Sequence, residues 1–240
     1  MRYGLSAQRS LINVCSRRFF GKDAKEQFLK NLSSIPASKH PRLVSDSDAN
    51  SAMSVLIPLV TVDGRDSVLL TKRSIHLRSH RGEVCFPGGR MDPGETTTET
   101  ALRETFEEIG VNAESVEIWG HLKSVIRRQA DFNVTPIVGY ISDERVLENL
   151  VVNSDEVQAV FTIPIDELIK KAGLTKFQSK RMKYTLPSFD STEFKVHHNA
   201  PNEYLHSTQR VWGLSGVMLH QALTLLNPDV YKHDLIVKFF

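Results

Sequence analysis

Three glutamates in the middle of the chain, Glu104, Glu107 and Glu108, stand at positions i, i+3 and i+4 of a predicted helix. Side chains at this spacing lie on the same side of a helix. Like charges there repel by about a few tenths of a kcal/mol per pair, so the cluster is unfavourable unless a cation lies among the carboxylates. Oxygen ligands without clustered cysteine or histidine favour Mg²⁺ or Mn²⁺ over zinc. The acids therefore predict a divalent metal site for phosphate chemistry.

The helix that carries these acids has recognisable ends. Thr96 followed three residues later by Glu99 matches a capping box, and Gly110 can end the helix in a left-handed conformation. Before the helix, residues 86–94 predict a strand that runs into a rigid loop and delivers Glu95 to the helix. We expect the side of the helix opposite the acids to pack against the core. That side carries Leu102, Thr105, Phe106 and Ile109.

The complete arrangement of Gly89, Glu95, Arg103 and the helix acids at fixed offsets resembles the signature of the Nudix hydrolases. Such enzymes hydrolyse a nucleoside diphosphate linked to another moiety. The resemblance implies that Glu104, Glu107 and Glu108 bind Mg²⁺ or Mn²⁺ and that Arg103 braces Glu95. It also implies an α/β fold, the Nudix α/β/α sandwich with a mixed sheet. Thr105 departs from the aliphatic or small apolar residue usual at its position, but its methyl group can still pack.

A second stretch, residues 69–89, resembles the Nudix subfamily that cleaves coenzyme A. It contains Leu-Leu-Thr-x-Arg-Ser, an arginine, a glycine and a closing Phe-Pro-Gly-Gly. Coenzyme A carries a 3′-phosphate and a diphosphate, and arginine forks suit phosphate oxygens. The alternative is that these cations are solvated. The candidate substrate-binding residues are Arg73, Arg78, Lys72, Gly88 and Gly89.

The predicted reaction is metal-dependent hydrolysis of coenzyme A or its acyl derivatives to 3′,5′-ADP and (acyl-)4′-phosphopantetheine. Glu107 or Glu156 would take the proton from water, and the sequence does not choose between them. Glu156 is a candidate because Nudix enzymes often supply one more acid from a loop, although it could also be a solvated loop acid. Two alternatives are a Nudix pyrophosphatase acting on ADP-ribose, dinucleotides or oxidised nucleotides, and a catalytically silent nucleotide-binding module.

Composition limits the other classes of function. The chain has 240 residues, 40% of them hydrophobic, which is enough for one domain with extensions. A net charge of +2 gives no support for nucleic-acid binding, and no apolar run is long enough to span a bilayer. We expect a small-molecule substrate, no nucleic acid or membrane partner, and a monomer or homodimer.

The first 22 residues are rich in arginine and serine and contain no acid, which is typical of a mitochondrial transit peptide. The alternative is a disordered basic tail, with a cytoplasmic or peroxisomal protein. The C-terminal residues do not match a peroxisomal tripeptide. The predicted organisation is a leader or tail (1–25), a short helix and polar connector (26–49), a Nudix domain (50–230) and a C-terminal extension (231–240).

Apolar periodicity and turn residues place the remaining elements. Helices are predicted over 24–32 and 213–226, and an amphipathic stretch over 166–172. Strands are predicted over 55–62, 67–71, 116–125, 134–141 and 157–163, with the first two joined by a hairpin at Asp63-Gly64. Residues 188–209 form a polar segment. Its histidines, His197, His198 and His206, lack metal-site spacing, and the flanking aromatics that could line an acyl or adenine pocket are Tyr184, Phe189, Phe194 and Tyr204.

Overall fold

The computed structural model describes residue 20 and residues 23–34, 51–126, 133–178, 182–201, 203–233 and 237–239. The predicted leader therefore lies outside the described residues except for Phe20 and residues 23–25, and so does most of the predicted connector. The predicted division into leader, connector, domain and C-terminal extension remains a prediction. Within the described residues, no helix is long and apolar enough to cross a membrane.

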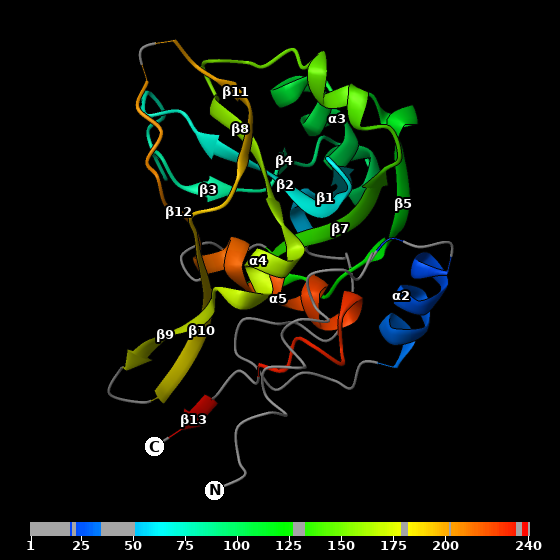
Figure 1. Cartoon of the computed structure of the whole chain (residues 1–240), viewed down its shortest axis with the longest axis vertical. Coiled ribbons are helices and arrows are strands. Elements are labelled where there is room, and N and C mark those ends of the chain that lie inside the picture. The colour runs from blue at the N-terminus through cyan, green and yellow to red at the C-terminus, as the bar shows by residue number, and fades with distance from the viewer. Residues whose placement is uncertain are drawn as a thin grey trace, which may run out of the picture.

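A mixed sheet forms the centre of the molecule (Figure 1). Strands β1 (Ser51–Val62) and β2 (Arg65–Arg73) form the predicted hairpin through Asp63 and Gly64, both at positive φ. β7 (Asn133–Ile141) runs parallel to β1 on its other side. The described strands follow the order β11-β8-β2-β1-β7-β5, with β3, β4 and β6 paired to β2, β1 and β7. Their bounds are β3 Val84–Cys85, β4 Gly88–Arg90, β5 Val116–His121, β6 Val125–Ile126, β8 Val157–Pro164 and β11 Lys195–Asn199.

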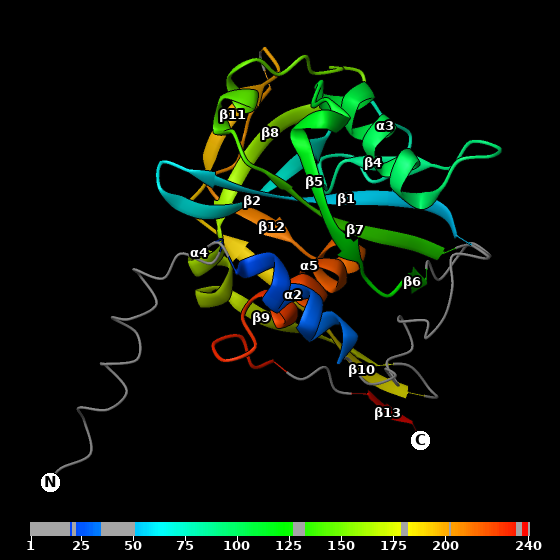
Figure 2. The ribbon, with the colours of Figure 1, turned by 90° about the vertical axis from the view of Figure 1, so that its right-hand side faces the viewer.

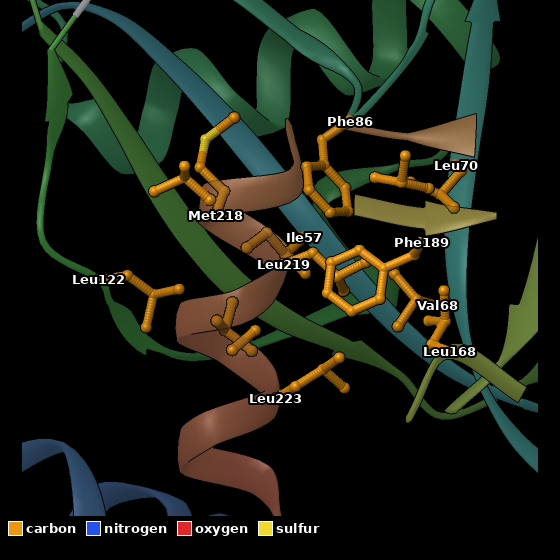
Figure 3. Packing of buried hydrophobic residues seen from close by; sticks show 14 of the residues in the cluster. Ile57, Val68, Leu70, Phe86, Leu122, Leu168, Phe189, Met218, Leu219 and Leu223 are labelled. Atoms are coloured by element: carbon orange, nitrogen blue, oxygen red, sulfur yellow. The ribbon is translucent and has the colours of Figure 1, made fainter. Parts of the chain in front are cut away.

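Helices cover both faces of this sheet, as Figure 2 shows. α3 (Thr97–Ile109) lies on one face, and α5 (Gly213–Leu226) with α2 (Ala24–Ser33) lies on the other. Alternate residues of β1 supply the two cores, because successive side chains of a strand point to opposite faces. Leu56 joins the cluster with Ile109 of α3, whereas Ile57 joins the cluster with Leu219 of α5 (Figure 3). The predicted α/β/α sandwich with a mixed sheet is confirmed.

A second, smaller sheet, which the sequence did not predict, packs beyond α5. It consists of β9 (Ala172–Gln178), β10 (Met182–Ser191), β12 (Gln209–Val211) and β13 (Val237–Phe239), with β10 paired to the other three. Phe189 of β10 is fully buried in the core beside α5. Phe189 and Tyr184 are therefore core residues of this layer, whereas Tyr204 is 73% exposed.

The other predicted elements agree closely with the observed ones. α5 has the predicted bounds, α2 and β8 extend by one residue, and the predicted strand 116–125 is divided into β5 and β6. The amphipathic stretch becomes α4 (Ile165–Lys170), which leads directly into β9. Short 3-10 turns cover Ala113–Ser115 and Glu144–Glu148.

Candidate active site

The ends of α3 are fixed by the residues that predicted them. The backbone N–H of Glu99 donates to the Thr96 hydroxyl at 3.2 Å, and the Thr96 N–H donates to the Glu99 carboxylate at 2.8 Å. This is the predicted capping box. Gly110 ends the helix at φ 74°, and its N–H donates to the Phe106 carbonyl at 2.8 Å. Both ends of the acid-bearing helix are therefore held by local hydrogen bonds.

The buried side of α3 differs from the predicted one. Phe106 was expected to pack against the core, but its side chain is 52% exposed, whereas Glu108 is only 4% exposed. The helix is turned so that Glu108 faces the sheet, where the Gly88 N–H donates to its carboxylate at 3.3 Å. Thr105 and Ile109 are buried as expected, and the Thr105 hydroxyl donates to the Ala101 carbonyl at 2.6 Å. The unusual threonine is thus accommodated without an unpaired polar group.

The three helix acids have unequal environments. Burial raises the pKa of Glu108 to about 8, and the negative charges of Glu156 and Glu104 add to this effect. Burial also raises the pKa of Glu104. The Glu107 side chain is 55% exposed. The acids therefore range from a buried carboxyl facing the sheet to one that faces solvent.

Two glycines of β4 allow the acids to approach the backbone of the sheet. A Cβ atom on Gly89 would overlap the carboxylate of Glu104. A Cβ atom on Gly88, which has φ 145°, would overlap the Ser54 carbonyl and the backbone of Val55. The Pro-Gly-Gly sequence is therefore needed for close packing between β1, β4 and the carboxylates of α3.

Arg103 lies at the centre of an ion-pair network that includes Glu95. Its guanidinium donates to Glu95 at 2.6 and 3.1 Å, to Glu107 at 3.0 Å and to Glu104 at 3.2 Å. The hydrogen bonds from Arg103, the Asp92 N–H and the Thr100 hydroxyl lower the pKa of Glu95 to about 2. Thr100 was not predicted as a site residue, because a threonine inside a helix gives no sequence signal for this role.

Arg73 and Glu156 come together with the acids from neighbouring strands. Glu156 precedes β8, its carbonyl accepts from the Ser74 N–H at 2.9 Å, and its charge raises the pKa of Glu108. The positive charge of Arg73 lowers the pKa of Glu108. Nε of Arg73 is buried and has no hydrogen-bond partner among the described residues. The Arg73 side chain also interacts with the Cys85 thiol, whose pKa it lowers.

The other two predicted cations lie differently. Arg78 is exposed in the loop that follows β2, and no hydrogen bond or ion pair joins it to another described residue. Lys72 is only 6% exposed and its ammonium interacts with the charge of Glu203. Of the predicted basic residues, the structure brings Arg73 to the helix acids.

The donor chemistry of this site fits a hard divalent ion. Within the described part of the chain, no three histidine, cysteine, aspartate or glutamate side chains are grouped closely enough to hold a metal. Arg103 instead supplies positive charge to Glu104 and Glu107. Burial is the main cause of the raised pKa values of Glu104 and Glu108, and a bound cation would stabilise their ionised forms. Oxygen donors in this condition suit Mg²⁺ or Mn²⁺.

A family model described as the NUDIX domain matches residues 51–185, which include α3, every helix acid and all strands of the central sheet except β11. This chain belongs to the Nudix family. It is 36% identical over 190 residues to the mitochondrial coenzyme A diphosphatase NUDT8 of Homo sapiens, which covers 77% of this chain and 73% of that protein. It is 40% identical over 119 residues to the peroxisomal coenzyme A diphosphatase NUDT7 of Mus musculus, covering 49% of each chain.

A bacterial relative is also similar. The Nudix hydrolase NudL of Yersinia enterocolitica is 35% identical over 175 residues, which is 72% of this chain and 80% of that protein. The Nudix domain and these relatives establish the chain as a Nudix hydrolase, an enzyme with a small-molecule substrate. Nudix hydrolases in general use divalent metal ions, in agreement with the donor set described above.

Proposed function

We propose that this Nudix hydrolase cleaves the diphosphate of coenzyme A and of its acyl derivatives, giving 3′,5′-ADP and (acyl-)4′-phosphopantetheine. The observation that carries the proposal is the stretch 69–89. Its residues form β2, β3 and β4, which place Arg73 and the two close-packed glycines next to the helix acids. The names of the two mammalian relatives support the same substrate class.

The proposed reaction is attack of water on one phosphorus of the diphosphate. A phosphorus–oxygen bond to water forms, the bridging phosphorus–oxygen bond breaks, and the proton of water passes to a carboxylate. A divalent ion held by Glu104, Glu107 and Glu108 would lower the pKa of water and offset charge in the transition state. Glu107, which is exposed, and Glu156, which lies beside Glu108, are the candidate bases.

Protein side chains contribute in two further ways. Arg73 presents a buried guanidinium nitrogen without a partner, which suits a phosphate oxygen. Arg103 holds Glu95 on one side and Glu104 and Glu107 on the other, so it fixes the carboxylates before substrate binds. We assign Arg103 and Glu95 to positioning because they are hydrogen-bonded to each other, to neighbouring side chains and to the backbone of Arg90 and Asp92.

The test is a substrate panel. Purified full-length protein is incubated with coenzyme A, acyl-coenzyme A, ADP-ribose and nucleotide sugars in Mg²⁺ and in Mn²⁺, and products are separated by chromatography. The proposal expects the highest kcat/KM for a coenzyme A substrate. A higher kcat/KM for ADP-ribose or a nucleotide sugar would assign the enzyme to another Nudix substrate class.

Alanine substitutions of two arginines test which of them binds a phosphate of the substrate. Arg73→Ala should lower kcat/KM by at least about tenfold, because one charge-assisted hydrogen bond is worth about 1.5–3 kcal/mol. Arg78→Ala, at an exposed position of the loop that follows β2, tests the other candidate arginine in the same assay. Comparison of coenzyme A with dephospho-coenzyme A then locates the contact. An equal loss for both substrates would show that Arg73 does not bind the 3′-phosphate.

We also propose that the enzyme works in mitochondria. The basic, acid-free composition of residues 1–22 and the mitochondrial name of the human relative support this location. Fusion of residues 1–30 to a fluorescent reporter tests it. Import of the reporter into mitochondria is expected, and a purely cytosolic signal would contradict the proposal.

A further inference from the structure

Two buried acceptor atoms without partners come from the start of β8 and from the segment that follows β11. Gln158 of β8 is 2% exposed, and its Nε2 donates to the Tyr204 carbonyl at 3.2 Å. Its Oε1 is buried and has no partner among the described residues, and the same holds for Oε2 of Glu203. Buried acceptors are normally paired, because water has been removed from them without replacement. Two orphaned acceptors together indicate that a ligand supplies the missing donor.

Specific hydrogen bonds hold the described residues on either side of this site, 199–201 and 203–206. The Ala200 N–H donates to the Gln158 carbonyl at 2.7 Å, and the Asn199 side chain donates to the Glu203 carbonyl at 2.9 Å. Nε2 of His76 lies 3.6 Å from Oε1 of Glu203, so this segment lies beside the loop that follows β2, as Figure 1 also shows. The backbone carbonyl groups of Gln158 and Glu203 are therefore each held by a hydrogen bond.

Lys72 completes the arrangement with a donor. Lys72 is 6% exposed, and its side chain lies next to Gly82. A Cβ atom added at Gly82 would lie 3.9 Å from Cε of Lys72. The charges of Lys72 and Glu203 interact without a direct ion pair between them. A ligand here must offer an N–H donor to the two acceptors and an acceptor to Lys72. A phosphate offers only acceptors and would be repelled by Glu203.

Two parts of coenzyme A share this donor-and-acceptor chemistry, the 6-amino edge of adenine and the amides of the pantetheine arm. The aromatic residue that directly follows Glu203 in the chain favours the base. Tyr204, whose carbonyl holds Gln158, has a side chain that is 73% exposed and meets the His206 ring edge-on at 5.0 Å. An exposed ring in this setting offers a face on which a purine can stack.

We infer that Gln158, Glu203 and Lys72 bind the 6-amino edge of the substrate's adenine and that Tyr204 stacks on the base. This inference rests on the proposed function for the identity of the substrate. It assigns these residues to base specificity, separate from the acids that carry out hydrolysis. It also gives Lys72 a role at the base in place of the phosphate role expected from sequence.

Ligand binding without turnover provides the test. Calorimetry with the full chain measures Kd for 3′,5′-ADP, for its analogue in which hypoxanthine replaces adenine, and for 4′-phosphopantetheine. The wild type should bind the adenine nucleotide at least about tenfold more tightly than the hypoxanthine nucleotide, because a 6-oxo group leaves the buried acceptors unpaired. Glu203→Gln should bring the ratio close to one, since an amide can also donate to a 6-oxo group.

Two further variants make the result specific. Glu193→Gln removes the same charge from an exposed side chain that pairs with Arg65, and it should leave the ratio unchanged. Tyr204→Ser, at an exposed position that a folded protein tolerates, should weaken both nucleotides by about tenfold through loss of stacking and leave 4′-phosphopantetheine unaffected.

The inference is overturned if the wild type does not distinguish the two bases, if Glu203→Gln keeps the wild-type ratio, or if Tyr204→Ser does not weaken the nucleotides. A selective loss of 4′-phosphopantetheine binding in Glu203→Gln would assign the residues to the pantetheine amides instead. Hydrolysis of coenzyme A is measured in parallel. Hydrolysis without base preference refutes the inference alone, whereas base preference without hydrolysis refutes the proposed function alone.

Discussion

At the scale of single residues, Glu108 departs most from the behaviour of a glutamate in water. Burial raises its pKa to about 8 from the ordinary value of 4.5. Between pH 4.5 and about pH 8, Glu108 keeps a proton in the folded, metal-free protein that it has released in the unfolded chain. The folded state then binds more protons, so the free energy of unfolding contributed by this group falls as the pH rises through that interval.

This sign gives a prediction for metal-free protein. In chelator, the melting temperature of the wild type should fall relative to that of Glu108→Gln as the pH rises from about 5 to about 8. The glutamine variant cannot titrate at this position and serves as the reference. Thermal unfolding followed by circular dichroism measures both. Parallel curves for the two proteins would show that Glu108 ionises normally.

Gly89 gives a second prediction at the residue scale. A Cβ atom at this position would overlap the Glu104 carboxylate, so Gly89→Ala should displace that carboxylate and lower kcat/KM by about 10²-fold. Gly173→Ala is the matched control, because its Cβ would make an ordinary contact at 3.6 Å with the Ser188 hydroxyl. Steady-state kinetics decide, and unchanged activity in Gly89→Ala would mean that Glu104 need not lie against β4.

Spacing alone predicted which acids gather on α3, but it did not predict how the helix is turned. Burying an apolar side chain normally costs less free energy than burying a carboxylate, so Phe106 rather than Glu108 was expected to face the core. The Gly88 N–H, which comes from a strand outside the helix, provides the buried carboxylate with a donor. That donor becomes visible only when β4 and α3 are packed together.

At the scale of elements, the caps of α3 connect stability to the site. Thr96→Ala removes the capping box next to Glu95, and it should lower the free energy of unfolding by about 1 kcal/mol and the melting temperature by about 2–4 °C. Thr192→Ala, at an exposed position after β10, is the control. Equal melting temperatures for the two variants would show that the box does not stabilise the helix.

Elements with strong local signals were predicted well, and those without them were missed. α3 and α5 combine helical periodicity with recognisable ends, so their bounds follow from the chain itself. β10 lies partly in a stretch for which the sequence predicted no element and partly in the predicted polar segment 188–209. Its pairing with β9 and the burial of Phe189 against α5 are tertiary contacts, which local patterns do not contain.

At the scale of the whole molecule, α2 is an integral part of the fold. Phe28 is 1% exposed, and its ring lies 5.8 Å from that of Trp119 on β5. α2 also approaches Gly120 so closely that a Cβ there would lie 2.9 Å from Leu32. The helix therefore closes the face of the sheet opposite the helix acids.

Removal of this contact should be costly. Phe28→Ala is expected to lower the free energy of unfolding by about 3–5 kcal/mol, because it leaves a cavity in a packed core. Leu29→Ala, at a side chain that is 41% exposed, should cost much less. Denaturant unfolding of the full chain provides both values. A small loss for Phe28→Ala would indicate that α2 is only loosely attached.

The proposed role of the helix acids in holding a divalent ion for diphosphate cleavage is tested most directly by coenzyme A hydrolysis with and without metal. The full-length protein is stripped with chelator, assayed, and assayed again after Mg²⁺ is restored. We predict that 3′,5′-ADP and 4′-phosphopantetheine appear in equal amounts only when Mg²⁺ is present. Undiminished hydrolysis after complete removal of metal would contradict the metal role of Glu104, Glu107 and Glu108.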